Sequence, residues 1–331
     1  MKKGQVYKIH SDFYYVRTDV QNVECKLRDV LKKQREKIVT GDFVEVENGF
    51  ITKILPRKSF IPRPSVANID QIIIVSALKS PDLDYTQLDR YIAFAKYYGL
   101  DVKLCFNKED LGFEDEFIAE ITSIYAPLGY DIFFTSATEH WGVANFQEAL
   151  QDKTSVLCGG SGVGKSSLIN AINSDFSLKT KDISEKTGRG THTTRHCEIM
   201  YLDDDTKIID TPGFSNLKFD FLLPTEVDLL FDEIAKYKGM CKYADCLHIT
   251  ETGCKVLENI NKIPETRYKS YLNFVEEART YKEKIKYEGR KTETSKKKIN
   301  SKTAVKISAV KRQSARNTMR QRVYKEAENV E

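Results

Sequence analysis

Long apolar runs are missing from this chain of 331 residues. No stretch approaches the roughly 18 apolar residues that a membrane-spanning helix needs, and no apolar segment follows the first four residues, so we expect no membrane partner and no signal peptide. Cysteine is also scarce. The seven cysteines are an odd number and only three of them cluster, which argues against a disulfide framework and fits a cytoplasmic protein with a metal site.

Charge is nearly balanced over the whole chain, at a net +4. The balance is uneven, because residues 282–331 hold 16 Lys and Arg against 6 Asp and Glu, a net +10 that leaves −6 for the rest. Such asymmetry favours a nucleic-acid partner for this basic C-terminal extension, bound by electrostatic attraction. We expect the extension to be helical or disordered on its own.

The first 58 residues show five short runs of alternating character with turn signals between them. These runs predict strands over residues 4–9, 13–18, 23–27, 41–46 and 49–54. Five strands in so short a segment fit a closed β-barrel of the OB type. OB barrels often bind RNA through aromatic side chains, but Tyr14, Tyr15 and Phe43 fit barrel packing equally well. The proline-rich residues 55–64 then predict an extended linker.

Strand and helix patterns alternate over residues 59–218, which predicts an α/β domain with a mostly parallel sheet. Within it, an apolar run at 155–158 leads into a G-x-x-x-x-G-K-[ST] motif, and a helical pattern follows. The glycines let backbone N–H groups curl around phosphate oxygens, the lysine reaches the terminal phosphates, and the hydroxyl of Ser166 can ligate Mg²⁺. The expected phosphate-binding residues are Gly159, Gly160, Ser161, Gly162, Val163, Gly164, Lys165, Ser166 and Ser167.

A second motif, Asn107-Lys108-Glu109-Asp110, follows another predicted strand, and α/β sheets bind ligands at the C-terminal ends of their strands. Asp110 can accept hydrogen bonds from the ring N–H and the exocyclic amine of guanine, a pair of donors that adenine lacks. Lys108 can pack along the base. The dipeptide Ser136-Ala137 ends the next predicted strand, and we expect it to make a second base contact through backbone N–H groups.

Residues 186–195 are rich in Gly, Arg and Thr without an apolar period, which predicts a loop. A threonine of this loop can complete the coordination of Mg²⁺ and sense the terminal phosphate; Thr194 is the first candidate and Thr193 the second. A predicted hairpin follows and ends in Asp210-Thr211-Pro212-Gly213. Asp210 can hold Mg²⁺ through water, and the N–H of Gly213 can meet the terminal phosphate.

The order of these motifs is unusual. In an ordinary GTPase the phosphate loop comes first and the base-reading motif comes last, whereas here residues 107–110 and 136–137 precede residues 159–167. A three-dimensional site survives circular permutation when the original termini lie close together. The sequence therefore predicts a circularly permuted P-loop GTPase domain.

A compact C-x4-C-x-H-x5-C cluster lies within a segment, 225–281, that is predicted to be helical. Its members are Cys241, Cys246, His248 and Cys254. Three thiols and one imidazole within 14 residues can surround a tetrahedral Zn²⁺, and four protein ligands leave no position for a substrate, so we expect one structural zinc ion. The alternative is three buried thiols beside a surface histidine.

The barrel, the permuted GTPase motifs and the compact cluster together resemble the RsgA (YjeQ) family of small ribosomal subunit biogenesis GTPases. The resemblance covers roughly residues 1–280 and includes the loop signature Gly188-Arg189-Gly190 and His192-Thr193-Thr194. It implies hydrolysis of GTP to GDP and phosphate, stimulated by the small (30S) ribosomal subunit, contact with 16S rRNA, and a role in late subunit maturation. We expect a cytoplasmic monomer that uses Mg²⁺ with GTP.

The expected domains are an OB-fold barrel (1–58), the permuted GTPase domain (59–218), a helical zinc-binding module (219–281) and the basic C-terminal extension (282–331). The extension is longer than the family leads us to expect, and its role is unassigned.

Hydrolysis requires an oriented water molecule, and Ras-like enzymes supply a Gln directly after the Asp-x-x-Gly motif. Phe214 follows Gly213 here, so we expect slow intrinsic turnover. His192 is a candidate to orient water once the loop closes, although an exposed or RNA-contacting histidine fits as well.

Two other functions remain open: a nucleotide-gated RNA-binding scaffold with incidental hydrolysis, and an ATP-using P-loop protein, which the base-reading motif argues against.

Overall fold

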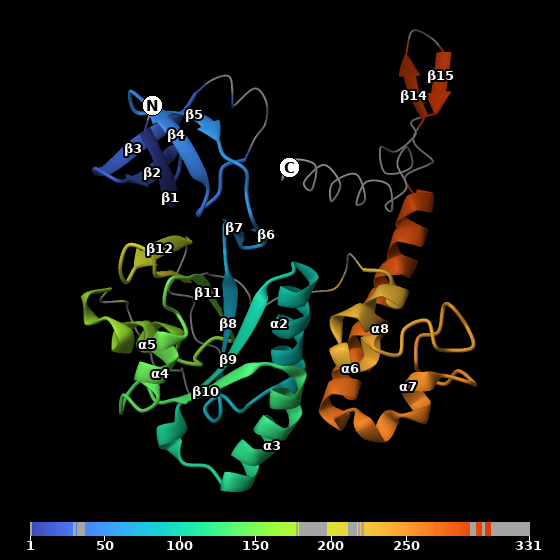
Figure 1. Cartoon of the computed structure of the whole chain (residues 1–331). Coiled ribbons are helices and arrows are strands. Elements are labelled where there is room, and N and C mark those ends of the chain that lie inside the picture. The colour runs from blue at the N-terminus through green and yellow to red at the C-terminus, as the bar shows by residue number, and fades with distance from the viewer. Residues whose placement is uncertain are drawn as a thin grey trace. The chain divides into compact units, whose positions relative to one another are not determined.

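A computed structural model describes residues 2–28, 31, 37–176, 178, 197–210, 217, 219, 222–291, 296–299 and 302–305. The chain divides into two compact units (Figure 1). The first unit comprises Met1–Leu217 and Pro264–Arg267, and the second comprises Lys218–Ile263 and Tyr268–Glu331. Among the described residues, no helix combines the length and apolar character that crossing a membrane requires.

Five strands form a closed barrel at the start of the first unit. They are β1 (Lys2–His10), β2 (Phe13–Thr18), β3 (Asn22–Leu27), β4 (Phe43–Glu47) and β5 (Phe50–Ile54). The strand order is β1-β2-β3-β5-β4, and a further pairing of β1 with β4 closes the barrel. Alternate residues point inward, so Val6, Val16, Val44 and Ile51 are fully buried. The predicted barrel is confirmed.

The proline-rich segment after the barrel is more ordered than the extended linker that we predicted. Strands β6 (Phe60–Pro62) and β7 (Ser65–Ala67) form an antiparallel hairpin. Pro62 stands at the end of its strand, where a missing N–H disturbs the ladder least. The bidentate ion pair of Arg57 with the fully buried Asp42, at 2.6 and 2.9 Å, ties this segment to the barrel.

A mostly parallel sheet follows, as predicted. Its strands are β8 (Gln71–Ala77), β9 (Asp101–Asn107), β10 (Asp131–Thr135), β11 (Thr154–Cys158), β12 (Glu198–Tyr201) and β13 (Lys207–Asp210). The order is β10-β9-β8-β11-β13-β12, with all neighbours parallel except β12, which pairs antiparallel with β13. β12 also pairs with β1 of the barrel at Lys8 and Glu198, which joins the barrel and this sheet into one 11-stranded sheet.

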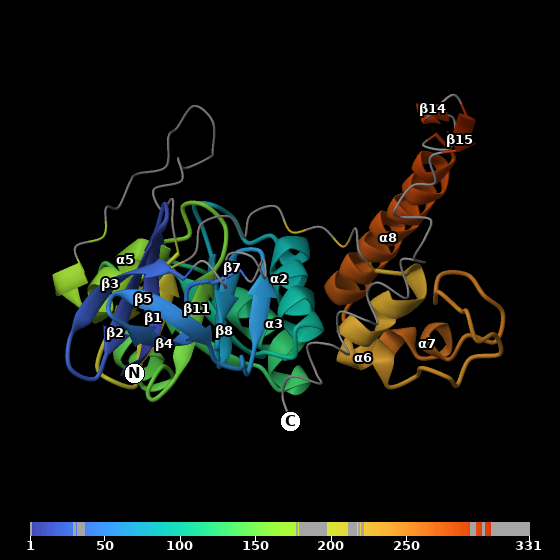
Figure 2. The same cartoon turned by 90° about the horizontal axis from the view of Figure 1, so that it is seen from above.

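Helices cover both faces of the sheet (Figure 2). They are α2 (Tyr85–Tyr97) and α3 (Asp115–Tyr125) on one face, and α4 (Val143–Glu148) and α5 (Lys165–Ile172) on the other. Along β8, Ile72 and Ile74 pack with the first pair, and Ile73 and Val75 pack with the second. Strand residues buried on both faces explain the continuous apolar run in the sequence.

Two of these helices, α3 and α4, were not among the predicted elements. Helix α2 is capped at its N-terminus by Asp84, whose side chain accepts from the backbone N–H of Gln87 at 3.0 Å. Short 3₁₀ helices are η1 (Glu109–Leu111), η2 (Ala126–Leu128) and η3 (Ser174–Phe176).

The second unit combines short helical turns with one long helix. Its elements are η5 (Pro224–Leu230), α6 (Asp232–Ala235), α7 (Lys255–Glu258), η6 (Ile260–Lys262), the part of α8 (Glu265–Lys291) from Tyr268 onward, β14 (Lys296–Ile299) and β15 (Lys302–Val305). The predicted helical segment is therefore interrupted by a long loop before α7. Phe231 packs against Tyr271 and Phe274 of α8, with ring centroids 5.6 and 5.7 Å apart.

The described residues of the basic C-terminal extension are helical up to Lys291, in keeping with the prediction, and then include a strand pair that was not predicted. Helix α8 runs into it, and β14 pairs antiparallel with β15. The lysine-rich strands lack the apolar alternation that makes a strand recognisable in a sequence.

Candidate functional site

The C-terminal edge of the parallel sheet gathers segments that lie far apart in the sequence. β9 ends at Asn107, β10 at Thr135, β11 at Cys158 and β13 at Asp210. The strands are parallel and in register, so Thr135 pairs with Asn107 and Leu157 with Asp210. All the predicted nucleotide-binding motifs that the structure describes leave this one edge, which is where open α/β sheets bind ligands.

The phosphate loop between β11 and α5 depends on its glycines. Gly159, Gly162 and Gly164 have φ angles of +151°, +79° and +93°, which favour glycine. A Cβ atom on Gly159 would lie 2.1 Å from the carbonyl oxygen of Val75, and one on Gly164 would lie 2.2 Å from the side-chain Nδ2 of Asn107. The loop therefore fits closely against two neighbouring strands.

Lys165 bends back over the same loop. Its Nζ donates hydrogen bonds to the carbonyl oxygens of Gly159, at 3.0 Å, and of Gly160, at 2.7 Å. Burial lowers the pKa of Lys165, and the nearby carboxylate of Asp210 opposes that shift. An ammonium group that donates to backbone carbonyl oxygens is well suited to transfer these hydrogen bonds to phosphate oxygens. Ser166 and Ser167 follow in the first turn of α5.

Asn107 connects three of the predicted motifs. This side chain is 1% exposed. Its Nδ2 donates to the carbonyl oxygen of Val163 in the phosphate loop at 3.0 Å, and its Oδ1 accepts from the backbone N–H of Ala137 at 3.2 Å. One buried amide thus fastens the base-reading motif to the phosphate loop and to the segment after β10.

The carboxylate of Asp110, in the predicted base-reading motif, is oriented from the same segment. Asp110 accepts a hydrogen bond from the hydroxyl of Ser136 at 2.6 Å, and Ser136 Oγ itself accepts from the backbone N–H of Glu139 at 3.0 Å. Lys108 adopts a left-handed conformation, with φ +68°, and its Nζ donates to the carbonyl oxygen of Ser80. Burial lowers the pKa of Lys108, with Asp110 opposing the shift. Glu109 opens η1 between these two side chains.

Ser136 and Ala137 contact the base-reading motif itself, while their predicted contact with a base stays a prediction. We expected their backbone N–H groups to contact a base. In the structure, the N–H of Ser136 donates to the carbonyl oxygen of Trp141 at 3.0 Å, and the N–H of Ala137 donates to Asn107. They hold Asp110 and Asn107 in place, and nothing in the spacing of two small residues indicated this indirect role.

The predicted switch residues fall mostly outside the described part of the chain. His192, Thr193, Thr194 and Gly213 lie there. Asp210 is described: it ends β13, is 6% exposed and lies close enough to Lys165 to oppose the lowering of its pKa. The structure therefore brings together the phosphate loop, the base-reading motif and Asp210.

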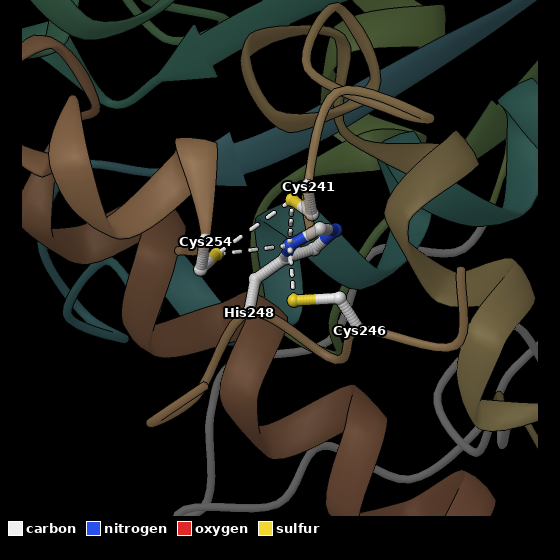
Figure 3. A group of neighbouring side chains, drawn as sticks. All are labelled: Cys241, Cys246, His248 and Cys254. Atoms are coloured by element: carbon white, nitrogen blue, oxygen red, sulfur yellow. Dashed lines mark hydrogen bonds between the residues drawn. The ribbon is translucent and has the colours of Figure 1, made fainter. Parts of the chain in front are cut away.

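The four predicted metal ligands converge in the second unit (Figure 3). Their ligand atoms, the Sγ atoms of Cys241, Cys246 and Cys254 and the Nδ1 of His248, all lie within 4.8 Å of one another. The Nδ1 atom is 3.6, 3.4 and 3.3 Å from the three sulfurs, in the order given, and two of the sulfurs, those of Cys241 and Cys254, are 3.9 Å apart.

These separations fit a tetrahedral ion. With Zn–S bonds of about 2.3 Å and a Zn–N bond of about 2.0 Å, the edges of a tetrahedron are about 3.8 Å between sulfurs and about 3.5 Å between sulfur and nitrogen. His248 is 3% exposed, so the alternative of a surface histidine is wrong. The cluster can hold a metal ion. Burial raises the pKa of the Cys246 thiol to about 12, so a bound metal ion must displace its proton.

The metal loop is held by groups that no sequence motif marks. Glu251 accepts hydrogen bonds from the backbone N–H groups of Leu247, Ile249 and Thr250 at 2.9, 2.8 and 3.0 Å. Burial alone would raise the pKa of Glu251, but these hydrogen bonds lower it to about 2.

Two tyrosines of α8 hold the same loop by its carbonyl groups. The hydroxyl of Tyr268 donates to the carbonyl oxygen of His248 at 2.7 Å, and that of Tyr271 donates to the carbonyl oxygen of Leu247 at 2.8 Å. Tyrosines three positions apart on a helix share a face, but that spacing alone does not say what the face contacts.

Comparison with known proteins agrees with this geometry. The family model described as "RsgA GTPase" matches residues 54–220, and the model described as "RsgA N-terminal domain" matches residues 3–50. The chain is similar to the small ribosomal subunit biogenesis GTPase RsgA of Alkaliphilus metalliredigens, with 37% identity over 286 residues that cover 84% of this chain and 98% of the relative. The protein of the same name from Caldanaerobacter subterraneus is 38% identical over 292 residues, covering 86% and 98%.

Solved structures give the same result. The crystal structure of YjeQ from Thermotoga maritima matches with a TM-score of 0.72 and 34% identity, over 84% of this chain and 98% of that chain. The structure of YloQ, described as a circularly permuted GTPase, matches with a TM-score of 0.70 and 29% identity, over 85% and 96%. With the permuted order of motifs, the barrel and the metal cluster, these matches confirm the resemblance found in the sequence: the chain belongs to the RsgA GTPase family.

Proposed function

We propose that this protein hydrolyses GTP to GDP and phosphate, in a manner stimulated by the small (30S) ribosomal subunit, and acts in late maturation of that subunit through contact with 16S rRNA. The observation that carries the proposal is the hydrogen bond from Asn107 to Val163, which joins a guanine-reading motif to a phosphate loop that follows it in the sequence. Membership of the RsgA GTPase family, whose curated members carry small-subunit biogenesis in their names, supplies the ribosomal part.

The assigned roles within the nucleotide site follow from the chemistry of each group. Asp110 accepts from guanine, and the ammonium of Lys165 and the N–H groups of the phosphate loop bind the phosphates. Ser166 supplies a hydroxyl ligand to Mg²⁺, which Asp210 holds through water. Thr194 and the N–H of Gly213, both outside the described residues, complete the magnesium and terminal-phosphate contacts.

The Cys3His cluster binds one Zn²⁺ in this proposal. The donor set of three thiols and one imidazole, and separations close to the edges of a zinc tetrahedron, favour this metal over the harder divalent cations. Four protein ligands leave no open position, so the ion has a structural role.

The proposed division of labour follows the four segments of the chain. The barrel (1–58) and the zinc-binding module (219–281) contact rRNA, the domain between them (59–218) binds and hydrolyses GTP, and the basic C-terminal extension (282–331) adds electrostatic attraction to RNA. Phe43, at 39% exposed, supports RNA contact by the barrel more than Tyr14, which packs against the barrel core. We place the protein in the cytoplasm as a monomer.

The test is GTP turnover measured with increasing amounts of purified small subunits, with large subunits as the control. We expect slow turnover alone, because Phe214 stands where Ras-like enzymes carry Gln, and saturable stimulation by small subunits only. A nucleotide-gated scaffold would bind small subunits in the GTP state without faster multiple turnover, and that result would overturn the enzymatic proposal.

His192 is the proposed water-positioning group in the stimulated reaction. His192→Ala should lower the stimulated kcat by about 100-fold, the lower range for removal of a group that positions or activates the nucleophile, and leave GTP affinity unchanged. Full stimulated turnover in His192→Ala would remove it from the catalytic machinery.

A further inference from the structure

The imidazole of His248 has two ring nitrogens with different surroundings. Nδ1 faces the three cysteine sulfurs at 3.3 to 3.6 Å and is the ligand atom. Nε2, on the other side of the ring, is buried and has no hydrogen-bond partner among the described residues. A neutral imidazole that ligates a metal through Nδ1 carries its proton on Nε2, so this buried N–H requires an acceptor.

One carboxylate faces that nitrogen. Asp228 Oδ2 lies 3.8 Å from His248 Nε2, and both side chains are almost fully buried, at 7% and 3% exposed. The other oxygen, Oδ1, accepts a hydrogen bond from Lys238 Nζ at 2.6 Å. Lys238 also donates to the carbonyl oxygen of Thr225 at 3.1 Å. The carboxylate is therefore anchored by one oxygen while the other points at the imidazole.

Asp228 reaches the histidine from outside the 14-residue metal loop. It lies on η5 (Pro224–Leu230), twenty residues before His248 in the sequence. His248 itself has a left-handed backbone, with φ +56°, and its carbonyl oxygen is held by Tyr268. With the backbone fixed in this way, the orientation of the ring about its side-chain bonds is the remaining freedom, and a carboxylate on Nε2 removes it.

We propose that Asp228 is a positioning residue of the metal centre: once a metal ion is bound, its Oδ2 accepts the Nε2–H of His248, which fixes the tautomer and the orientation of the ring that presents Nδ1 to the ion. The proposal rests on the metal centre assigned under the proposed function. Partners of this kind hold a ligand in its binding orientation and raise its basicity, and their removal typically lowers metal affinity by about 10- to 100-fold.

The test measures zinc release from the intact chain, purified with its metal, to an excess of a chromogenic chelator. Asp228→Ala should release zinc about 10- to 100-fold faster than the wild type. Asp228→Asn keeps an oxygen that can accept from Nε2–H, and should recover part of that loss. Lys238→Met removes the partner of Oδ1 but leaves Oδ2 facing the imidazole, so its release rate should change much less than that of Asp228→Ala.

A matched control separates this role from a general effect of charge. Glu258 is an exposed carboxylate of the same unit, paired with Lys255, and Glu258→Ala should release zinc at the wild-type rate. Equal release rates for the wild type and Asp228→Ala would overturn the proposal, as would Lys238→Met matching Asp228→Ala, because the ion pair would then be the only function of the carboxylate. A wild-type chain that holds no zinc would instead contradict the metal centre itself.

A second measurement needs no variant. Nitrogen-15 NMR of the histidine ring in the zinc-loaded wild type reports which nitrogen carries the proton. We expect a protonated Nε2 whose proton exchanges slowly with water. Ligation through Nε2, with the proton on Nδ1, would overturn the assignment of Asp228.

Discussion

The nucleotide site and the metal centre are held together in opposite ways. The described residues of the nucleotide site come from the ends of four strands between positions 107 and 210, and a parallel sheet sets their register. The four residues of the metal centre come from one loop of 14 residues, organised by Glu251 and two tyrosine hydroxyls. The first site is fixed by a large apolar core before any ligand binds, whereas the second, with the proposed ion bound, would depend on that ion for much of its stability.

This difference explains why circular permutation is tolerated. The sheet places Asn107 against the phosphate loop through strand pairing and burial, and these contacts do not depend on which motif comes first in the chain. A metal centre whose ligands all come from one short loop has no such freedom, because the spacing of the ligands in the sequence determines its geometry.

The largest expected effect comes from disrupting the metal centre, whose ligands lie close together in the sequence. Cys246→Ser should reduce zinc content from about one ion per chain to almost none, since one of four ligands is lost and structural zinc contributes about 10–16 kcal/mol in small zinc modules. GTP affinity should change by less than about threefold, because the nucleotide residues are held by sheet contacts of their own. Metal analysis and nucleotide titration check both statements.

The control for that change is Cys25→Ala, which removes a buried cysteine from the barrel and leaves the cluster intact. It should retain zinc in full. If Cys246→Ser abolished GTP binding as completely as zinc binding, the contrast between the two sites would be wrong.

A smaller but still large effect comes from disturbing the nucleotide site, whose residues lie far apart in the sequence. Gly164→Ala would place a Cβ atom 2.2 Å from Asn107 Nδ2, in a backbone conformation with φ +93°. Strain and overpacking together should weaken GTP binding by about 3 kcal/mol, or roughly 100-fold. Zinc content should not change.

Gly99→Ala is the matched control for the backbone effect. Gly99 has φ +65°, and a Cβ atom added there would meet no other atom within 4 Å, so this variant isolates the conformational strain from the clash. Its GTP affinity should equal that of the wild type. A Gly164→Ala variant with unchanged affinity would show that the contact between the phosphate loop and the base-reading motif is not needed.

The smallest effect concerns the carboxylate that organises the metal loop. Because hydrogen bonds from the loop lower the pKa of Glu251 from 4.5 to about 2, its stabilisation is complete above pH 4.5 and is lost as the pH falls toward 2. At pH 7, Glu251→Gln should lower the free energy of unfolding by about 1–2 kcal/mol, allowing for partial exposure.

Denaturant titrations of both proteins between pH 7 and pH 3 check this sign. The difference between wild type and Glu251→Gln should stay constant down to about pH 4.5, near the ordinary pKa of a glutamate, and shrink below it. A difference that grows on acidification would contradict the assigned hydrogen bonds.

Much of the fold was predictable because its signals are local. The barrel strands alternate with period two, and β8 is an uninterrupted apolar run. Helix α3 carries a local signal that the predicted elements do not include, since its apolar residues Ile118, Ile121 and Tyr125 recur at helical spacing. Helix α4, with six residues, is too short for a periodic pattern to stand out.

The candidate site was predictable in its residue types but not in its contacts. The motifs named Asn107, Asp110 and Lys165 from chemistry alone. The bond from Asn107 to Val163 depends on strand register, and the hydroxyl of Ser136 on Asp110 depends on the conformation of the loop after β10. Asp228 lies outside the metal motif, so only the folded chain brings it to His248.

The most direct test of the central claim, that residues 107–110 read the base for a phosphate loop that follows them, is small-subunit-stimulated turnover of Asp110→Asn with GTP and with xanthosine triphosphate. The exocyclic amine of guanine becomes a carbonyl oxygen in xanthine, which an amide donor can meet and a carboxylate cannot. The account predicts that the variant loses turnover of GTP and gains turnover of the xanthosine nucleotide. Unchanged selectivity for GTP in a folded Asp110→Asn protein would contradict it.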